Sequence, residues 1–402
     1  MSSVATHDSQ AIALLCAPIA VGDAKPLTSS EWAKLASAIH ASALERPGAL
    51  VGLTASEVGD RLGVDRDVAS RVASLLDRGG TLAFELERLE GRGIWIVARA
   101  DDAYPDPLKR RLGLRAPAVL FGAGRREVVP GRGVAVVGSR DASAEALEFA
   151  EELGRSIARE GATVVSGAAR GVDRTAMASA TDAGGSAVGV VADSLVRLTQ
   201  QPDIRAALAD ELLTLVTPYA PEARFSVGNA MGRNHLIYCL SDAAVVVATA
   251  AGSGGTWAGA IENLKAGWVP LWVWDSAAAP EGNRELLAHG GRPLDAPTVE
   301  ALFSGQGGVH TVASDSPAAG VPKSAVPAAP VAALLPALER FLATPRTEME
   351  VRKELGLAQG QARALLTRGV DSGWFVREGK PYRYVAAEGV AQPALFDAAQ
   401  VG

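Results

Sequence analysis

The sequence predicts an α/β protein built on a doubly wound parallel sheet, with a helical domain before the sheet and a winged-helix domain after it. Short apolar, β-branched runs alternate with helical patterns between residues 93 and 303, and purely helical patterns occupy residues 1–92. A helix-turn-helix pattern and a hairpin follow the segment 304–330, which is rich in Gly, Ser, Ala and Pro. The length of 402 residues agrees with this division, because it is more than twice the usual size of one domain.

The composition excludes a disordered or fibrous chain and also an all-over basic surface. Hydrophobic residues make up 48% of the chain and charged residues 21%, which is ordinary for a folded protein. The 39 basic and 45 acidic residues give a formal net charge of -6. Any site for a polyanion must therefore be a local cluster of positive charge.

The cysteine count and the N-terminal apolar run point to a cytoplasmic protein without a membrane partner. Cys16 and Cys239 cannot form a disulfide framework, so we expect a reducing compartment. The run Ala11–Val21 is too short to span a bilayer, and no basic region precedes it. We expect this run to form a buried helix of the first domain.

Residues 1–92 are expected to form the N-terminal helical domain. Ser29 and Ser30 open one helical pattern, and Thr54 opens another that ends near Gly63. A further helical pattern follows this glycine, so the pair is spaced like a SAM-like or helix-hairpin-helix-like module, or like a helix-turn-helix. Such a pair is either a DNA-binding module or a simple packing unit, and both interpretations stay open.

From residue 93 the period changes to that of buried strands and crossover helices, which predicts the core at 93–303. Two segments between the strands have the length and spacing of helices, Ala144–Glu160 and Thr256–Lys265. Strands alternating with helices indicate parallel strands covered on both faces. The predicted strands are Ile94–Val97, Val134–Val137, Thr163–Val165, Ala187–Val191, Ala243–Val247 and Val269–Val273.

Residues 304–330 have the composition of a flexible linker, residues 331–386 form the predicted winged-helix domain, and residues 387–402 form a tail. The winged-helix pattern consists of helices at Ala332–Leu342, Thr347–Leu355 and Gln359–Val370, followed by a hairpin at 373–385. This module carries nine basic and six acidic residues between Val331 and Val385. DNA and protein remain equally good partners for it.

The loops that follow the strands carry the candidate functional residues, because ligands of such sheets bind beyond the carboxyl ends of the strands. Glycines in these loops let the backbone approach an anion, and arginines supply phosphate donors. This convergence of glycines and arginines on one edge of the sheet predicts a polyanion or nucleotide site. The loops are Gly138-Ser139-Arg140, Ser166 to Asp173 (with Gly167, Arg170 and Gly171), Gly232 to His235 and Gly252 to Thr256.

The absence of cofactor-binding motifs limits the ligands that the sequence predicts. The chain has neither the Gly-x-Gly-x-x-Gly fingerprint for dinucleotides nor a P-loop, and its five histidines are scattered, so we predict no cofactor and no metal. His235 is expected to be a hydrogen-bonded structural residue. Asp173 is a helix cap or an acid–base group, with the cap favoured.

Motifs across most of the chain resemble those of the DNA-processing protein A (DprA/Smf) family. They occur in the same order and spacing, and Tyr104-Pro105 and Val119-Leu120-Phe121 resemble the segment that leads into the Rossmann-like domain of that family. The N-terminal helical and C-terminal winged-helix patterns also match its longer members. The motifs are Val134 to Arg140, Val165 to Asp173, Gly184-Gly185, Gly232 to Asn234, Leu240 to Asp242, Gly282-Asn283 and Gly290.

The resemblance implies a Rossmann-like core in a non-enzymatic protein that binds single-stranded DNA. It further implies protection of incoming DNA, loading of the RecA recombinase in natural transformation, and a homodimer formed through the core. The DNA-contacting residues implied by the motifs are Ser139, Arg140, Ser166, Gly167, Arg170, Gly171, Arg233 and Asn234. Gly138, Gly254 and Thr256 complete the predicted phosphate-binding set.

The chain departs from the family pattern at several positions, which makes it a divergent member. Met177 stands where the family usually has a histidine, and Arg233-Asn234-His235 replaces Arg-Asn-Arg, which removes one fixed positive charge. We therefore expect a lower affinity for phosphate.

The alternative is a nucleotide sensor, or an enzyme like the nucleoside monophosphate phosphoribohydrolases of a related fold. The loop Gly252 to Thr256 resembles the Gly-Gly-x-Gly-Thr loop of those enzymes. Their glutamate three residues after the threonine is Gly259 here, and Glu262 follows three residues later. The sequence therefore favours binding of a nucleotide over its hydrolysis.

Overall fold

The computed structural model describes residues 6–19, 24–297, 299, 302, 342, 344–354, 366, 370, 375–378 and 383–386. These residues divide into two compact units. The first unit takes those within 1–19, 25–76 and 89–317, and the second takes those within 20–24, 77–88 and 318–402. Within the described residues, no helix is long and apolar enough to cross a membrane.

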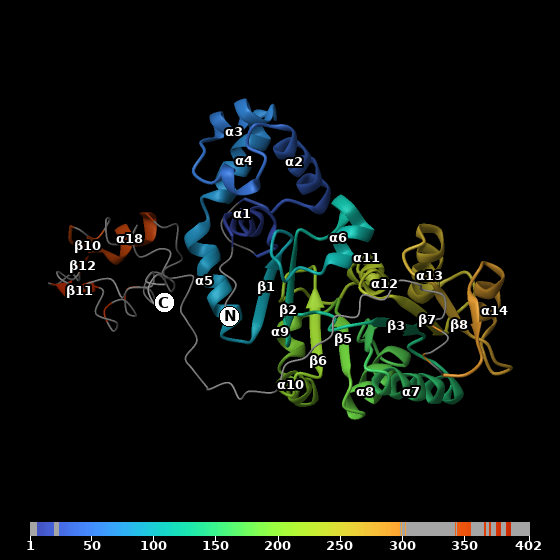
Figure 1. The fold of residues 1–402 in the computed structure, drawn as a ribbon. Coiled ribbons are helices and arrows are strands. Elements are labelled where there is room, and N and C mark those ends of the chain that lie inside the picture. The colour runs from blue at the N-terminus through green and yellow to red at the C-terminus, as the bar shows by residue number, and fades with distance from the viewer. Residues whose placement is uncertain are drawn as a thin grey trace, which may run out of the picture. The chain divides into compact units, whose positions relative to one another are not determined.

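A nine-stranded sheet forms the centre of the first unit (Figure 1). Its strand order is β1-β2-β6-β5-β4-β3-β7-β8-β9. The six predicted strands are all present, as β1, β3, β4, β5, β7 and β8. The strands are β1 (Ile94–Ala98), β2 (Val119–Ala123), β3 (Gly133–Gly138), β4 (Thr163–Ser166), β5 (Ser186–Val190), β6 (Leu213–Thr217), β7 (Ala243–Ala248), β8 (Leu271–Trp274) and β9 (Arg292–Leu294).

The sheet is parallel from β6 to β9 and antiparallel at its other edge, where β1 pairs with β2 and β2 with β6. The prediction of a wholly parallel sheet is therefore wrong at this edge. Apolar periodicity reports that a strand is buried but not in which direction it runs, so the antiparallel pairs were not predictable from it. Strands β2, β6 and β9 were also not predicted as strands.

Helices cover both faces of the sheet. Ala135 and Val137 of β3 belong to one hydrophobic core with side chains of α6, α12 and α13, so the alternate residues Val134 and Val136 face the opposite layer. Figure 1 shows α7 and α8 side by side in that layer. The helices are α6 (Asp106–Leu112), α7 (Ala144–Arg159), α8 (Val172–Asp182), α9 (Leu195–Leu198), α10 (Pro202–Ala209), α11 (Val227–Gly232), α12 (Asn234–Cys239), α13 (Gly254–Ala266) and α14 (Glu281–Ala288), with a 3-10 helix η2 (Gly113–Arg115).

Four further helices of the first unit lie N-terminal to the sheet: α1 (His7–Cys16), α2 (Ser29–Ala41), α3 (Ala55–Leu62) and α4 (Arg66–Leu76), with a 3-10 helix η1 (Pro47–Leu50). The predicted helix starts at Ser29 and Thr54 are confirmed, since Thr28 and Thr54 each form a capping box. Gly63 ends α3 in the left-handed conformation. Helix α1 is largely buried and contacts β1 and β2, so these helices attach at the antiparallel edge of the sheet.

In the second unit the described elements are α5 (Gly79–Glu90, most of it in this unit), β10 (Arg346–Thr347), α18 (Glu348–Glu354), β11 (Phe375–Glu378) and β12 (Arg383–Ala386). Strands β11 and β12 form the predicted antiparallel hairpin, and β10 pairs with β12. Thr347 bonds to Glu350 at the start of α18, where a helix was predicted. The predicted helix at Ala332–Leu342, apart from Leu342, and most of the one at Gln359–Val370 lie outside the described residues.

Asn283 of α14 holds together the carboxyl ends of β7 and β8. Its amide oxygen accepts from the Thr249 amide at 3.0 Å, and its Nδ2 donates to the carbonyls of Val247 and Trp274, both at 2.9 Å. The side chain is buried, so all three bonds are shielded from water.

We expect Asn283→Ala to lower the free energy of unfolding by about 2–4 kcal/mol, because two buried carbonyls and one buried amide lose their partner. Urea titration followed by tryptophan fluorescence measures this change. The control is Gln10→Ala, which removes an exposed amide side chain and should change the stability by less than about 0.5 kcal/mol. Equal effects of the two variants would contradict the role assigned to Asn283.

Candidate functional site

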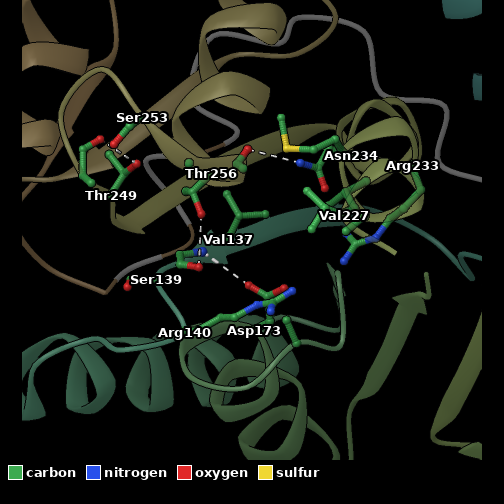
Figure 2. Close-up of a pocket in the computed structure, with 18 of the residues that line it drawn as sticks. Val137, Ser139, Arg140, Asp173, Val227, Arg233, Asn234, Thr249, Ser253 and Thr256 are labelled. Carbon is green, nitrogen blue, oxygen red and sulfur yellow. Dashed lines mark hydrogen bonds between the residues drawn. The ribbon is translucent and has the colours of Figure 1, made fainter. Parts of the chain in front are cut away.

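An open cavity of about 380 Å³ lies beyond the carboxyl ends of β3 and β7 (Figure 2). The chain leaves β3 toward β4 on one side, and β7 lies on the other side, so this is the point at which the strand order reverses. The lining comes from the loops after β3, β4 and β7 and from α11, α12 and α13. The main lining residues are Val137, Gly138, Ser139, Arg140, Ala169, Asp173, Phe225, Val227, Met231, Arg233, Asn234, Thr249, Ser253, Gly254, Gly255 and Thr256.

The two strands that flank the cavity lose their regular pairing at their ends. The register between β3 and β7 shifts at Gly138, which pairs with Ala248 after a bulge. Thr256 of α13 fixes the end of β3, because its hydroxyl donates to the Gly138 carbonyl at 3.1 Å. Gly138 must be glycine here, since a Cβ would lie 2.5 Å from the Val172 side chain.

A buried carboxylate, Asp173, organises the loops below the cavity. Its two oxygens accept from the amides of Gly138 at 3.3 Å and Gly167 at 3.1 Å, which follow β3 and β4 respectively. The Ala169 amide is a further donor, and Arg233 is the nearby positive charge. Asp173 was predicted as a helix cap or an acid–base group, but its carboxylate bonds to amides outside its own helix.

Arg233 is the most constrained cation of the site. Its side chain is 5% exposed, and one guanidinium nitrogen, Nη2, donates to the Gly167 carbonyl at 2.9 Å. The guanidinium lies directly against Gly167, where a Cβ would come within 2.2 Å of it. The buried Nε has no hydrogen-bond partner among the described residues, and the Arg233 side chain lines the cavity.

Burial shifts the pKa values of Arg233 and Asp173 in opposite directions. It lowers the pKa of Arg233 and raises the pKa of Asp173, because water no longer stabilises either ion. Each ion offsets this penalty for the other, since the Asp173 charge raises the pKa of Arg233 and the Arg233 charge lowers that of Asp173. The pair thus depends on both members being charged.

The N-terminus of α13 forms the wall opposite β3. Its first residues, Gly254, Gly255 and Thr256, line the cavity, and its N-cap residue Ser253 makes no side-chain capping bond. The first amides of a helix have no partner inside the helix and carry partial positive charge. Asn234 fixes this wall by donating from Nδ2 to the Gly255 carbonyl at 3.1 Å. The arrangement suits an anion.

The structure brings many, but not all, of the sequence-predicted site residues to the cavity. Gly138, Ser139, Arg140, Arg233, Asn234, Gly254 and Thr256 line it. Ser166 is fully buried and donates to the Val136 carbonyl at 2.6 Å, and Gly167 lies beneath Arg233. Arg170 is 75% exposed and pairs with Asp141. Gly171 packs against the Ser139 carbonyl with a positive φ of 84°.

The sequence did not single out the apolar rim of the cavity. Phe225, Val227 and Met231 line it, although no strand end or glycine motif contains them. Phe225 lies in a loop, and Val227 and Met231 lie in a helix of only six residues, so none of them belongs to a stretch long enough to show hydrophobic periodicity. Thr249 and Ser253, which follow β7, could have been found, because Ser253 lies within the Gly252 to Thr256 motif and Thr249 lies three residues before it.

His235 has a structural environment, and the described residues contain no cluster of metal ligands. The His235 ring packs near Trp268, with centroids 6.2 Å apart, and it bonds to the backbone of Gly232, so its prediction as a structural residue is confirmed. Burial lowers the pKa of His235, which keeps the ring neutral near pH 7. In the part of the chain that the structure describes, no three His, Cys, Asp or Glu residues gather as a metal site.

Comparison with known proteins places this core among relatives. Residues 95–297, half of the chain, match the family described as DNA recombination-mediator protein A. A Mycobacterium tuberculosis H37Rv protein with the provisional name DNA processing protein DprA is 33% identical over 226 residues, which are 52% of this chain and 57% of that protein. The Bacillus subtilis 168 DNA processing protein DprA is 30% identical over 160 residues, 39% of this chain and 52% of that protein. The chain thus matches little more than half the length of these relatives.

The fold is also shared with a solved structure. The X-ray structure of DNA processing protein A (DprA) from Streptococcus pneumoniae aligns with 67% of this chain and 96% of its own length, with a TM-score of 0.53 and 20% sequence identity. The core of the chain therefore has the fold of that protein.

We expect Asp173→Asn to destabilise the protein by about 3–5 kcal/mol, because the change leaves Arg233 as an uncompensated buried charge and places an NH2 group against backbone amides. Thermal unfolding measures the loss. Asp182→Asn, at an exposed position of the same helix, is the matched control and should have almost no effect. The double variant Asp173→Asn/Arg233→Met should lose less than the sum of the two single variants; simple additivity would contradict the coupling.

Proposed function

The chain belongs to the DNA recombination-mediator protein A family, and from this premise we propose that it binds single-stranded DNA as a DNA-processing protein. One observation carries the proposal. Arg140, Arg233 and the N-terminus of α13 surround a single open cavity at the switch point of the sheet. These donors suit phosphate, which is present in every nucleotide, so the binding is independent of sequence.

The proposed contacts differ in kind. Arg140 is exposed, and no carboxylate lies within ion-pair distance of it among the described residues, so it offers a complete guanidinium to a phosphate. Arg233 contributes from the cavity floor, together with Ser139, Asn234, Gly254 and Thr256 on its walls. We assign Gly138, Ser166, Gly167 and Gly171 to the support of these groups, and Arg170 to the flank of the site.

The wider role follows from the family resemblance. We propose that the protein protects incoming single strands in the cytoplasm and loads the RecA recombinase onto them during natural transformation. A recombination mediator must release its strand to the recombinase, and moderate affinity would favour that release. The loss of one fixed charge at His235 agrees with such affinity. We further propose that the protein is a homodimer through its Rossmann-like core.

We also propose the domain organisation predicted from the sequence, with boundaries at 1–92, 93–303, 304–330, 331–386 and 387–402. The winged helix at 331–386 is supported by the order β10, α18, β11, β12 and by the three-stranded sheet β10-β12-β11. A helix that follows a short first strand, with a hairpin completing the sheet, suits that fold. Its surface would bind DNA or a protein.

The alternative of a phosphoribohydrolase gains no support from Glu262. This residue lies on an exposed position of α13 and does not line the cavity. A glutamate in place of Gly259 would not fit without movement, because its Cβ would lie 3.1 Å from the buried Tyr238 ring. Asp173, the one carboxylate in the lining, is already bonded to backbone amides.

The experiment that tests DNA binding is a titration with a single-stranded oligonucleotide at several salt concentrations. We expect Arg140→Ala to weaken binding about tenfold and to reduce the slope of log K against log[salt] by about 0.7, since one phosphate contact is lost. Arg159→Ala, at the far end of α7 and 60% exposed, is the matched control and should leave both values unchanged. Failure of the unmodified protein to prefer single strands over duplex would refute the proposal.

A second experiment separates binding from hydrolysis. We expect no free base after incubation of the protein with nucleoside monophosphates, because Asp173, the one carboxylate in the lining, is bonded to backbone amides. Chromatography of the reaction mixture detects any base. Release that disappears in Glu262→Gln would overturn the DNA-binding proposal in favour of the enzyme.

A further inference from the structure

An exposed apolar rim borders the cavity. Phe225 is 45% exposed, Val227 71% and Met231 42%, and all three line the same cavity as Arg140. They lie within seven residues of one another, in the loop before α11 and on α11 itself. Solvent exposure of three large apolar side chains at one place carries a cost in water, which indicates a surface that is covered when a ligand is bound.

The aromatic ring of Phe225 is held in place beside the positive charge. The Arg140 guanidinium carbon lies 5.2 Å from the ring centroid, in a cation–π contact. The Phe225 amide donates to the Asp193 carboxylate at 3.1 Å, and the next residue, Ser226, caps α11. The backbone on both sides of the ring is therefore anchored, and its exposed face needs little ordering to receive a flat ligand.

We propose that Phe225 stacks an unpaired nucleobase of the bound strand, with Val227 and Met231 extending the apolar surface beneath it. This inference rests on the proposed function, because Arg140 holds the phosphate of the same nucleotide. It makes Phe225 a residue that determines the preference for single strands. Bases within a duplex are stacked on one another and cannot present a face to Phe225, whereas an unpaired base can.

The chemistry of the lining favours a nucleotide over other flat or apolar ligands. A peptide side chain would fill the rim but would leave Arg140, Arg233 and the first amides of α13 without an anion. Inorganic phosphate would satisfy the cations but would leave the apolar rim in water. A nucleotide joins an anion to an aromatic face and so satisfies both parts.

The test compares a single-stranded oligonucleotide with an abasic strand of equal length, in which the sugar–phosphate chain lacks bases. We expect the unmodified protein to bind the abasic strand about 5- to 100-fold more weakly, the range for loss of one stacked base. Phe225→Ala should weaken binding to the normal strand by a similar factor and abolish the difference between the two strands. Phe225→Trp should retain both the affinity and the difference.

Salt dependence separates the failure of this inference from failure of the proposed function. Phe225→Ala should leave the salt slope unchanged, whereas Arg140→Ala lowers it, because a stacked base releases no counterions. Leu114→Ala, a control at another exposed apolar residue (51%) that does not line the cavity, should bind like the unmodified protein. Equal binding of normal and abasic strands by the unmodified protein would overturn the stacking role while leaving DNA binding intact. Absence of binding to any strand would overturn both.

Discussion

The bond between the Asp173 carboxylate and the amides after β3 and β4 is the constraint on which the site depends. Parallel strands end at the same edge of a sheet, but their loops are free to diverge, and at Gly138 the register itself shifts. Asp173 ties the two loops together from below, and this places Gly167 where its carbonyl receives Arg233. The position of the buried arginine is thus a consequence of the Asp173 carboxylate, whose hydrogen bonds to backbone amides hold the loops that line the cavity.

Much of this architecture follows from local patterns in the sequence. The apolar runs at Val134 and Ala243 predict buried strands, and glycines after them predict close turns, so the edge of the sheet that carries the site was predictable. The antiparallel pairing of β1 and β2 was not, because apolar periodicity does not report the direction in which a strand runs. Likewise Ser166 and Gly167 were assigned to ligand contacts, since spacing shows that a residue lies at a strand end but not whether it lies above or below the loop.

The apolar rim shows a different limit of sequence patterns. Phe225 becomes informative only through its neighbours. Arg140 comes from a loop 85 positions earlier, and the two residues meet because the loop after β3 and the segment before α11 line the same cavity. The solvent exposure of a side chain is a property of the folded surface, so it cannot be predicted from a short sequence segment. A residue of this kind is identified only once the cavity of the folded protein is known, whereas Gly138 or Arg233 can be identified from a sequence motif.

The net charge of -6 and an anion site are compatible because the positive groups are concentrated, and this concentration also limits what can bind. Asp173 offsets the charge of Arg233, so the attraction for phosphate comes mainly from Arg140 and the first turn of α13. These groups surround a cavity of about 380 Å³, the size of a small-molecule site. The phosphates of a duplex lie on the surface of a wide, stiff helix, so a single phosphate of a duplex cannot enter this cavity. A single strand can bend a nucleotide into the cavity, so under the proposed function the shape of the site would select against duplex before any base is contacted.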